Sequence, residues 1–300
     1  MANEFELLWE LLRADSPSGD EDVLADWLAE TLTRTLPDAR MERVGDCLIA
    51  RRGVPKVAVF AHLDTTGFTL GYDKSLIPIG GPAAKPSDLL KPVGSAFGGN
   101  KVGARGSLVG STDELPGSRW VYAAEARQEG EEIVGPYLDN RAGVWAAVRT
   151  LSECENVAVA FTSGEEHSGK GAILCARRLF EQDAITQALI ADLTWDTKHV
   201  HSGQGVAISL RDRSVPRRRY LERVLALAQA SGLLFQREIE SAGGSDGAWI
   251  DRSGAPLDWV FVGAPEQHPH TAAERVSVQD LRGMVAMLVF LVNGLTGNSQ

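Results

Sequence analysis

The sequence has few cysteines, no long hydrophobic run and no excess of basic residues. Its three cysteines, Cys47, Cys154 and Cys175, form no Cys-x-x-Cys pair, which argues against a disulfide framework and fits a reducing compartment. The longest apolar stretch, residues 284–292, is too short to span a bilayer. The acidic, amphipathic start of the chain does not read as a signal peptide. We therefore expect a cytoplasmic protein.

Basic charge is scarce as well. Lysine and arginine number 30 against 40 aspartate and glutamate residues, a formal net charge of −10. A nucleic-acid partner would need a concentrated basic face to offset that charge. The one dense basic run, residues 217–219, is explained by the solvated start of a helix. We expect neither a nucleic acid nor a membrane as partner.

What is present is the pattern of a folded α/β protein. Four short, continuous apolar runs predict strands buried on both faces, at 57–61, 157–161, 188–191 and 259–262. Helical spacing of apolar residues occurs before, between and after them, at 3–13, 23–32, 141–153, 168–181, 217–231 and 278–295. Ser277-x-x-Asp280 opens the last helix with a capping signature. This alternation predicts a mixed, largely parallel sheet covered by helices on both faces.

Residues 68–134 interrupt that alternation. The segment is rich in glycine, has no helical pattern and contains short β-like runs at 107–110 and 120–124. We predict a small β domain inserted into a catalytic domain made of residues 1–67 and 135–300.

Histidines and acids follow the predicted strands. His62 comes directly after the first of them, and Asp64 points to the same side of an extended chain, so one can bind a metal while the other orients its ring. In α/β sheets, ligands bind beyond the carboxyl ends of the strands. Further candidates follow the other strands or precede the helix at 141: Asp139, Glu165, Glu166, Asp192, Asp196, His268 and His270.

Five of these residues form a chemically balanced metal site. If Asp139 bridges two metals, each metal has three protein ligands and an open position, as catalytic sites require. Three carboxylates and a shared hydroxide then offset two divalent cations, so no buried charge is left unpaired. Mixed imidazole and carboxylate ligation suits Zn²⁺, and also Co²⁺ or Mn²⁺. The proposed ligands are His62, Asp139, Glu166, Asp192 and His270.

Six motifs carry a family resemblance. AHLDTTG, YLDNRAG, SGEEHSGKGA, ADLTWD, GGSDGAW and PHTAAERV resemble, in the same order, the motifs of the M42 family of aminopeptidases. These are dinuclear enzymes known as glutamyl or deblocking aminopeptidases, and sometimes as endoglucanases. SPSGDED at 16–22 and IGGPAAKP at 79–86 also look like that family, so the resemblance covers nearly the whole chain.

The resemblance implies a role for each residue. Glu165 would be the general base that activates a metal-bridging water, and Asp64 would orient His62. The metal ligands would be those already proposed, and the reaction would be removal of N-terminal residues from peptides. The family's inserted β domain takes part in oligomer assembly and substrate access, and its members commonly form large homo-oligomers, often dodecamers.

Departures from the family pattern leave points open. Thr65 stands where the family usually has an acid, and His167 where it has a small apolar residue. Residues 267–270 read Gln-His-Pro-His rather than Arg-Tyr-x-His, so His268 is a rival to His270. The short insert leaves the number of subunits open.

Alternative functions also remain open. An N-acyl amino acid deacylase or a carboxypeptidase would share the metal site, and a non-catalytic interaction protein could use the same scaffold. A glycosidase could use paired carboxylates but gives no reason for the two histidines. Glu165 could be a carboxylate at a helix start. Asp246 could line the substrate cleft or be a turn acid.

Overall fold

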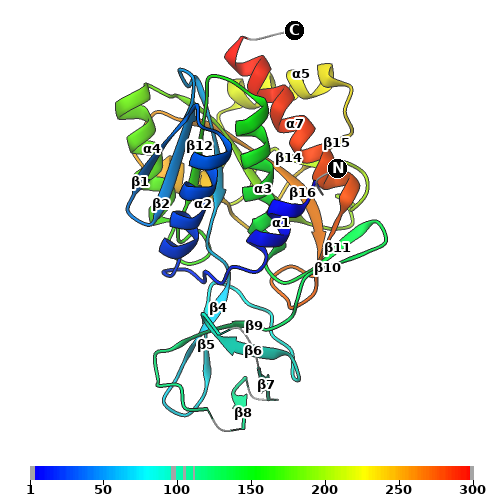
Figure 1. Cartoon of the computed structure of the whole chain (residues 1–300). Coiled ribbons are helices and arrows are strands. Elements are labelled where there is room, and N and C mark those ends of the chain that lie inside the picture. The colour runs from blue at the N-terminus through cyan, green and yellow to red at the C-terminus, as the bar shows by residue number, and fades with distance from the viewer. Residues whose placement is uncertain (1–3, 96–98, 104–105, 111, 298–300) are drawn as a thin grey trace.

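The structure is a computed structural model that describes residues 4–95, 99–103, 106–110 and 112–297. Most of the described chain forms one large α/β layer structure, and a smaller β structure projects from the end opposite the C-terminus (Figure 1). The strands of the main sheet are β1 (Ala39–Val44), β2 (Cys47–Arg52), β3 (Val57–His62), β10 (Arg127–Glu129), β11 (Glu132–Gly135), β12 (Val157–Thr162), β13 (Gln187–Trp195), β14 (Val206–Ser209), β15 (Phe235–Glu238), β16 (Asp258–Gln267) and β17 (Glu274–Ser277).

Parallel strands form the centre of this sheet. The strand order is β1-β2-β12-β3-β13-β16-β17-β11-β10, with β14 also paired to β16 and β15 to β14. β12, β3, β13 and β16 are parallel neighbours, while the strands flanking them run antiparallel. The central strands are the apolar runs of the sequence, and β3 and β12 are buried along their whole length. Side chains alternate between the two faces of a strand, so both faces of these strands must be covered.

Helices cover the two faces. Alternate residues of β3, such as Val59 and Phe60, belong to different apolar clusters. The larger cluster includes α1 (Glu6–Leu11), α2 (Asp22–Thr35), α3 (Leu138–Glu153), α5 (Arg218–Ser231) and α7 (Val278–Thr296); the smaller includes α4 (Lys170–Asp183) and α6 (Asp246–Arg252). The predicted fold class, a mixed sheet between two helical layers with a small β insert, is confirmed.

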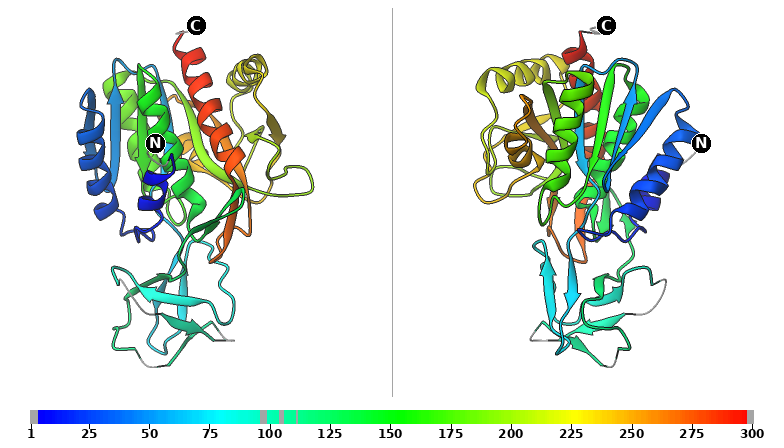
Figure 2. Two further views of the ribbon diagram at one scale, coloured as in Figure 1. Left: turned by 45° about the vertical axis from the view of Figure 1, so that its right-hand side comes forward. Right: turned by 90° about the vertical axis from the view of Figure 1, so that its left-hand side faces the viewer.

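A second sheet is built only from the glycine-rich segment. Its antiparallel strands are β4 (Gly67–Leu70), β5 (Leu76–Ile79), β6 (Leu89–Pro92), β7 (Asn100–Val102), β8 (Leu108–Val109) and β9 (Arg119–Tyr122). Its own apolar cluster includes Phe68, Leu90 and Trp120, and Figure 2 shows it set off from one end of the main sheet. The strands that follow, β10 and β11, pair with the main sheet. The division at 68 and 134 stays a prediction about folding units.

Helix α7 has the length and composition of a membrane span, with a mean hydropathy of 1.4. The helix, at 19 residues, is longer than the continuous apolar run at 284–292, which alone is too short to span a bilayer. Its buried residues, among them Leu281, Leu288 and Leu291, pack in the larger apolar cluster beside α3 and α5. A core helix of a folded domain meets the same criteria, and the packing of α7 is that of a core helix.

Two local expectations differ from the structure. β13 runs on to Trp195 because it pairs with β16 as far as Glu266, so Asp192 lies within a strand instead of after one. At the start of α7, Ser277 caps the helix by accepting the N–H of Gln279. Asp280 does not complete the capping box, because its carboxylate accepts the N–H groups of Gly203 and Gly205 from another loop.

Candidate metal centre

The carboxyl ends of the central strands bring the predicted site residues together. His62 is the last residue of β3, and it is level with Thr162, the last residue of β12. The loop after β12 carries Glu165 and Glu166, and Asp192 comes from β13 two strands along. Parallel strands end at a common edge, so side chains that are up to about 130 residues apart in sequence meet there.

Asp139 and His270 complete the centre from outside the four strands. Asp139 lies at the start of α3, where its ψ of 106° departs from helical geometry before the regular helix begins near Arg141. The peptide bond from Asp139 to Asn140 is cis. His270 lies in the loop between β16 and β17, and its carbonyl accepts the N–H of Ala83 and the hydroxyl of Tyr122 at 3.0 Å. Ala83 follows β5 and Tyr122 ends β9, so the smaller β structure supports the His270 loop.

The five residues form two groups that share Asp139. His62 Nε2 lies 3.1 Å from Asp139 Oδ1 and 3.5 Å from Asp192 Oδ1. On the other side, His270 Nε2 lies 3.4 Å from Asp139 Oδ2 and 3.5 Å from Glu166 Oε1. Within each group the possible ligand atoms all lie within 4.8 Å of one another. One carboxylate thus faces both groups, with one oxygen toward each.

Burial and mutual charge dominate the electrostatics of the centre. Burial raises the pKa of Glu166 to about 8 and that of Asp192 to about 6. Burial opposes protonation of His62 and His270, but the carboxylates around them raise both pKa values, to about 10 for His270. Without cations, the folded protein would hold acids and histidines in unusual protonation states. Such strain is what bound cations relieve.

The donor set fits two divalent cations. Each group offers one imidazole and two carboxylates when Asp139 is counted in both, which is the ligand type and number expected of a catalytic zinc site. Glu166 Oε1 is buried and has no hydrogen-bond partner among the described residues, although it faces His270. A buried carboxylate oxygen without a donor is a costly arrangement that a metal ion would satisfy.

Asp64 organises both His62 and the loop after β12. Fully buried, it places Oδ1 3.5 Å from His62 Nδ1. The same oxygen accepts the N–H of Glu165 at 2.9 Å, and Oδ2 accepts the N–H of Glu166 at 3.0 Å. Ser18 donates its hydroxyl to Oδ2 at 2.6 Å. Asp64 therefore fixes the backbone of the Glu165–Glu166 pair relative to the His62 ring.

The Glu165 side chain lies at the wall of an open cavity. The cavity has a volume of about 530 Å³, and its wall also includes His62, Asp139 and Asp192. Burial raises the pKa of Glu165 well above its ordinary value, and the neighbouring carboxylate of Glu166 raises it further. Glu165 belongs to neither group of candidate ligands, so its carboxyl group is available for proton transfer.

The other residues singled out from the sequence lie outside the two ligand groups. His268 is exposed and belongs to neither group, whereas His270 belongs to one. His167 lines the cavity but is exposed. Asp246 opens α6 and is buried, and it accepts the hydroxyl of Thr162 at 2.6 Å behind the cavity wall. Asp196 accepts the N–H of Ser202 from its own loop and the side-chain amide N–H of Gln267 at the end of β16.

Two further buried carboxyl groups lie beside the centre and were not singled out from the sequence. Glu274 accepts the backbone N–H of Asp139 at 3.1 Å. Glu266 is fully buried, and neither of its oxygens has a hydrogen-bond partner among the described residues. Burial raises the pKa of both well above the ordinary value. Each falls within a segment rich in acids and histidines, but no spacing rule marks it.

Comparison with known proteins agrees with the fold and identifies the family. The sequence model of the M42 glutamyl aminopeptidase family matches residues 114–287. A protein of Acetivibrio thermocellus described as an aminopeptidase is 25% identical over 95% of this chain and 97% of its own. An aminopeptidase of the archaeon Desulfurococcus kamchatkensis has a similar structure, with a TM-score of 0.86, 19% identity, and coverage of 97% of this chain and 94% of that one.

A second solved structure is also similar. The TET1 peptidase of Pyrococcus horikoshii, which can assemble into a tetrahedron or a large octahedral shell, has a TM-score of 0.77 and 20% identity, over 97% of this chain and 99% of its own. With the family match spanning more than half of the chain, this protein belongs to the M42 glutamyl aminopeptidase family. The family resemblance of the motifs is confirmed, and the chain is a metallopeptidase of the aminopeptidase class.

Proposed function

We propose that this protein hydrolyses N-terminal residues from peptides, with Glu165 as general base beside a pair of metal ions. One observation supports the proposal most strongly: Asp139 faces two groups of ligand atoms, and Glu165 lies at the wall of the same cavity. A shared carboxylate can hold two metal ions close together, as two-metal hydrolysis needs, and an acid that binds neither ion is free to act as a base.

The residues of the centre divide into metal ligands and a proton-transfer group. His62, Asp139 and Asp192 would hold one metal ion, and Asp139, Glu166 and His270 the other. When bound, divalent ions lower the pKa of water and polarise a scissile carbonyl group. Zn²⁺ is the ion that this donor set favours, with Co²⁺ and Mn²⁺ as alternatives.

Glu165 would move the proton. Its carboxylate takes a proton from the attacking water and passes it to the leaving amine. Its environment suits that task, because burial raises its pKa well above the ordinary value, and a carboxylate of raised pKa is a stronger base toward water. Asp64 keeps it in place through the Glu165 N–H.

The cavity accommodates a peptide end. A volume of about 530 Å³ is within the range of small-ligand sites and suits the first one or two residues of a peptide. We further propose that the protein forms a homo-oligomer in which the second sheet takes part, as the shells of the Pyrococcus horikoshii TET1 peptidase support. Its three free, buried cysteines fit the expected cytoplasmic location.

A panel of aminoacyl-anilides, assayed with Zn²⁺, Co²⁺ and Mn²⁺, tests the proposal. We expect hydrolysis of substrates with a free α-amine and two metal ions per chain by elemental analysis. Cleavage of N-acyl amino acids alone would replace the proposal by a deacylase. Fewer than one bound divalent ion per chain after loading would support a non-catalytic protein.

A further inference from the structure

The cavity continues beyond the metal ligands into a wall of uncompensated acids. Apart from the centre itself, the acids and the one arginine that line it within the described residues are Asp212, Glu238, Glu240 and Arg213. Acids therefore outnumber bases in the part of the cavity beyond the centre. A low-dielectric cleft lined by one sign of charge concentrates the field of that charge.

Glu238 is the acid most directly connected to the centre. It ends β15, where it is paired with Ser209 of β14, and it accepts the hydroxyl of Thr194. Thr194 is two residues beyond Asp192 on β13, so both point to the same side of the strand. Glu238 is 5% exposed. Burial raises its pKa, and the groups that oppose this effect are the hydroxyls of Thr194 and Ser209, not a basic side chain. Its hydrogen-bond donors among the described residues are neutral hydroxyl groups.

Asp212 and Glu240 are held in the same way. Asp212 accepts the hydroxyl of Ser245 at 2.6 Å and the N–H of Ser214 at 2.7 Å. Glu240 Oε1 accepts the three successive backbone N–H groups of residues 241–243. Against the opposing effect of burial, these N–H groups lower the pKa of Glu240. Within the described part of the chain, no ion pair joins either acid to a lysine or arginine.

Arg213 does not offset these acids. Its side chain is exposed, and its backbone N–H binds the carbonyl of Gly243 at the outer loop of the cavity. A guanidinium at the rim is screened by solvent, whereas Glu238 and Asp212 lie within the protein. The deep part of the cavity is therefore the negative part.

We propose that this acidic wall selects peptides whose first residue is basic, lysine or arginine; the inference rests on the aminopeptidase activity proposed above. A cationic side chain would supply the charge that Glu238 lacks. Trp249 and Phe261 also line the cavity, and aromatic faces suit the methylene stem of such a side chain. The charge of the wall favours a cationic side chain over a glutamyl side chain, because the glutamyl carboxylate would be repelled by the acids.

The matched substrates are lysyl- and norleucyl-anilide, which differ in the ammonium group. We expect the metal-loaded enzyme to favour the lysyl substrate in kcat/KM by at least about tenfold. Glu238→Gln keeps the shape and an acceptor for Thr194, and it should lower the lysyl-to-norleucyl ratio by about tenfold. Asp212→Asn should lower the same ratio and serves if Glu238→Gln does not fold. The exposed Glu181→Gln is the control, with no change in the ratio.

Two results would overturn the inference. One is a ratio near one in the unmodified enzyme. The other is a preference for glutamyl-anilide that Arg213→Gln abolishes, since the rim arginine would then set the specificity.

Binding separates this inference from the proposed activity. If no aminoacyl-anilide is cleaved, the proposed function fails. Calorimetric titration with free lysine and norleucine would still measure which side chain the cavity binds more tightly. Tighter binding of lysine, weakened by Glu238→Gln, supports the acidic wall as a basic-residue site. Equal binding of the two amino acids overturns it.

Discussion

The carboxylate of Asp64 accepts the backbone N–H of Glu165 at 2.9 Å with the same oxygen that faces the His62 ring at 3.5 Å. A ligand and the proposed base are thus positioned by one buried acid. Groups that orient ligands typically change metal affinity by 10- to 100-fold when they are lost. In this protein the orienting acid also supports the loop that carries the base.

Asp64→Asn should therefore affect two measurements. We expect metal affinity to fall by about 10- to 100-fold, as measured by competition with a chelator. We also expect kcat to stay low at saturating metal, because the Asn amide replaces one of the oxygens that accept N–H groups from residues 165 and 166. Full recovery of kcat in excess metal would show that Asp64 acts on the metal alone.

Glu165→Gln should separate catalysis from metal binding. Loss of a general base lowers kcat by about 10²- to 10⁴-fold, and because Glu165 belongs to neither ligand group, the metal content should stay the same. The measurement is steady-state kinetics alongside elemental analysis, with the exposed Glu155→Gln as control. Wild-type turnover in the Gln variant would rule out this role.

Asp139 should govern the metal stoichiometry. It belongs to both ligand groups, whereas His270 belongs to one. After loading and desalting, we expect Asp139→Ala to retain almost no metal and His270→Ala to retain about one ion per chain. An equal loss in the two variants would argue against Asp139 as a shared ligand.

Glu266 should make stability depend on pH. Burial raises its pKa well above the ordinary value, and the neighbouring Glu274 adds to this effect. The folded protein therefore binds this proton more tightly than the unfolded chain, so stability falls as pH rises above the unfolded pKa of about 4.3. Glu266→Gln removes that dependence. In the metal-free protein, the variant should raise Tm by at least about 2 °C at pH 8 and by less at pH 5. A constant difference would contradict the assignment.

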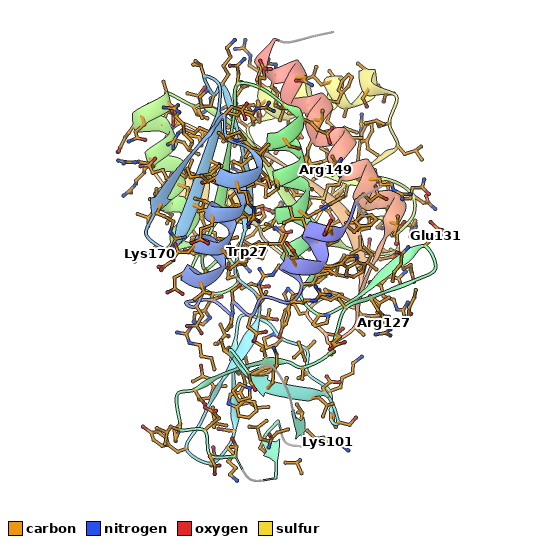
Figure 3. The ribbon with its side chains drawn as sticks, viewed as in Figure 1. Trp27, Lys101, Arg127, Glu131, Arg149 and Lys170 are labelled. Carbon is orange, nitrogen blue, oxygen red and sulfur yellow. The ribbon has the colours of Figure 1, made fainter. Side chains whose placement is uncertain are left out.

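Arg141 should be essential for stability. Its buried guanidinium donates to the carbonyl groups of Leu11 and Ala14, to Leu63 O and to the hydroxyl of Ser16. Arg141→Lys cannot satisfy all of these acceptors, and we expect a loss of about 2–5 kcal/mol in denaturant unfolding. On the same helix, the half-buried Arg149 (labelled in Figure 3) pairs with Glu153 at the surface and lies over the Trp145 ring, but it satisfies no buried backbone carbonyl among the described residues. Arg149→Lys should change stability by less than about 0.5 kcal/mol.

The parts of the fold that could be predicted are those marked by a pattern of residues along the sequence. The apolar runs that became β3 and β12 have few alternatives, because a continuous apolar stretch must be buried on both sides. The flanking strands gave no such signal: β1 and β15 are half-exposed and carry charged residues. The seven-residue helix α6 is too short for a clear periodic pattern. Register was equally hidden, and pairing with β16 carried β13 past Asp192.

The sequence by itself determined which donors exist and that they lie close to strongly apolar segments, as His62, Glu166 and Asp192 do. Only the tertiary structure decided that the two oxygens of Asp139 face different groups, that His270 and not His268 points into the centre, and that Glu238 and Glu266 are buried nearby. The physical reason is that strand order, register and loop direction arise from packing between distant segments, and these fix the distances between side chains that spacing along the chain leaves free.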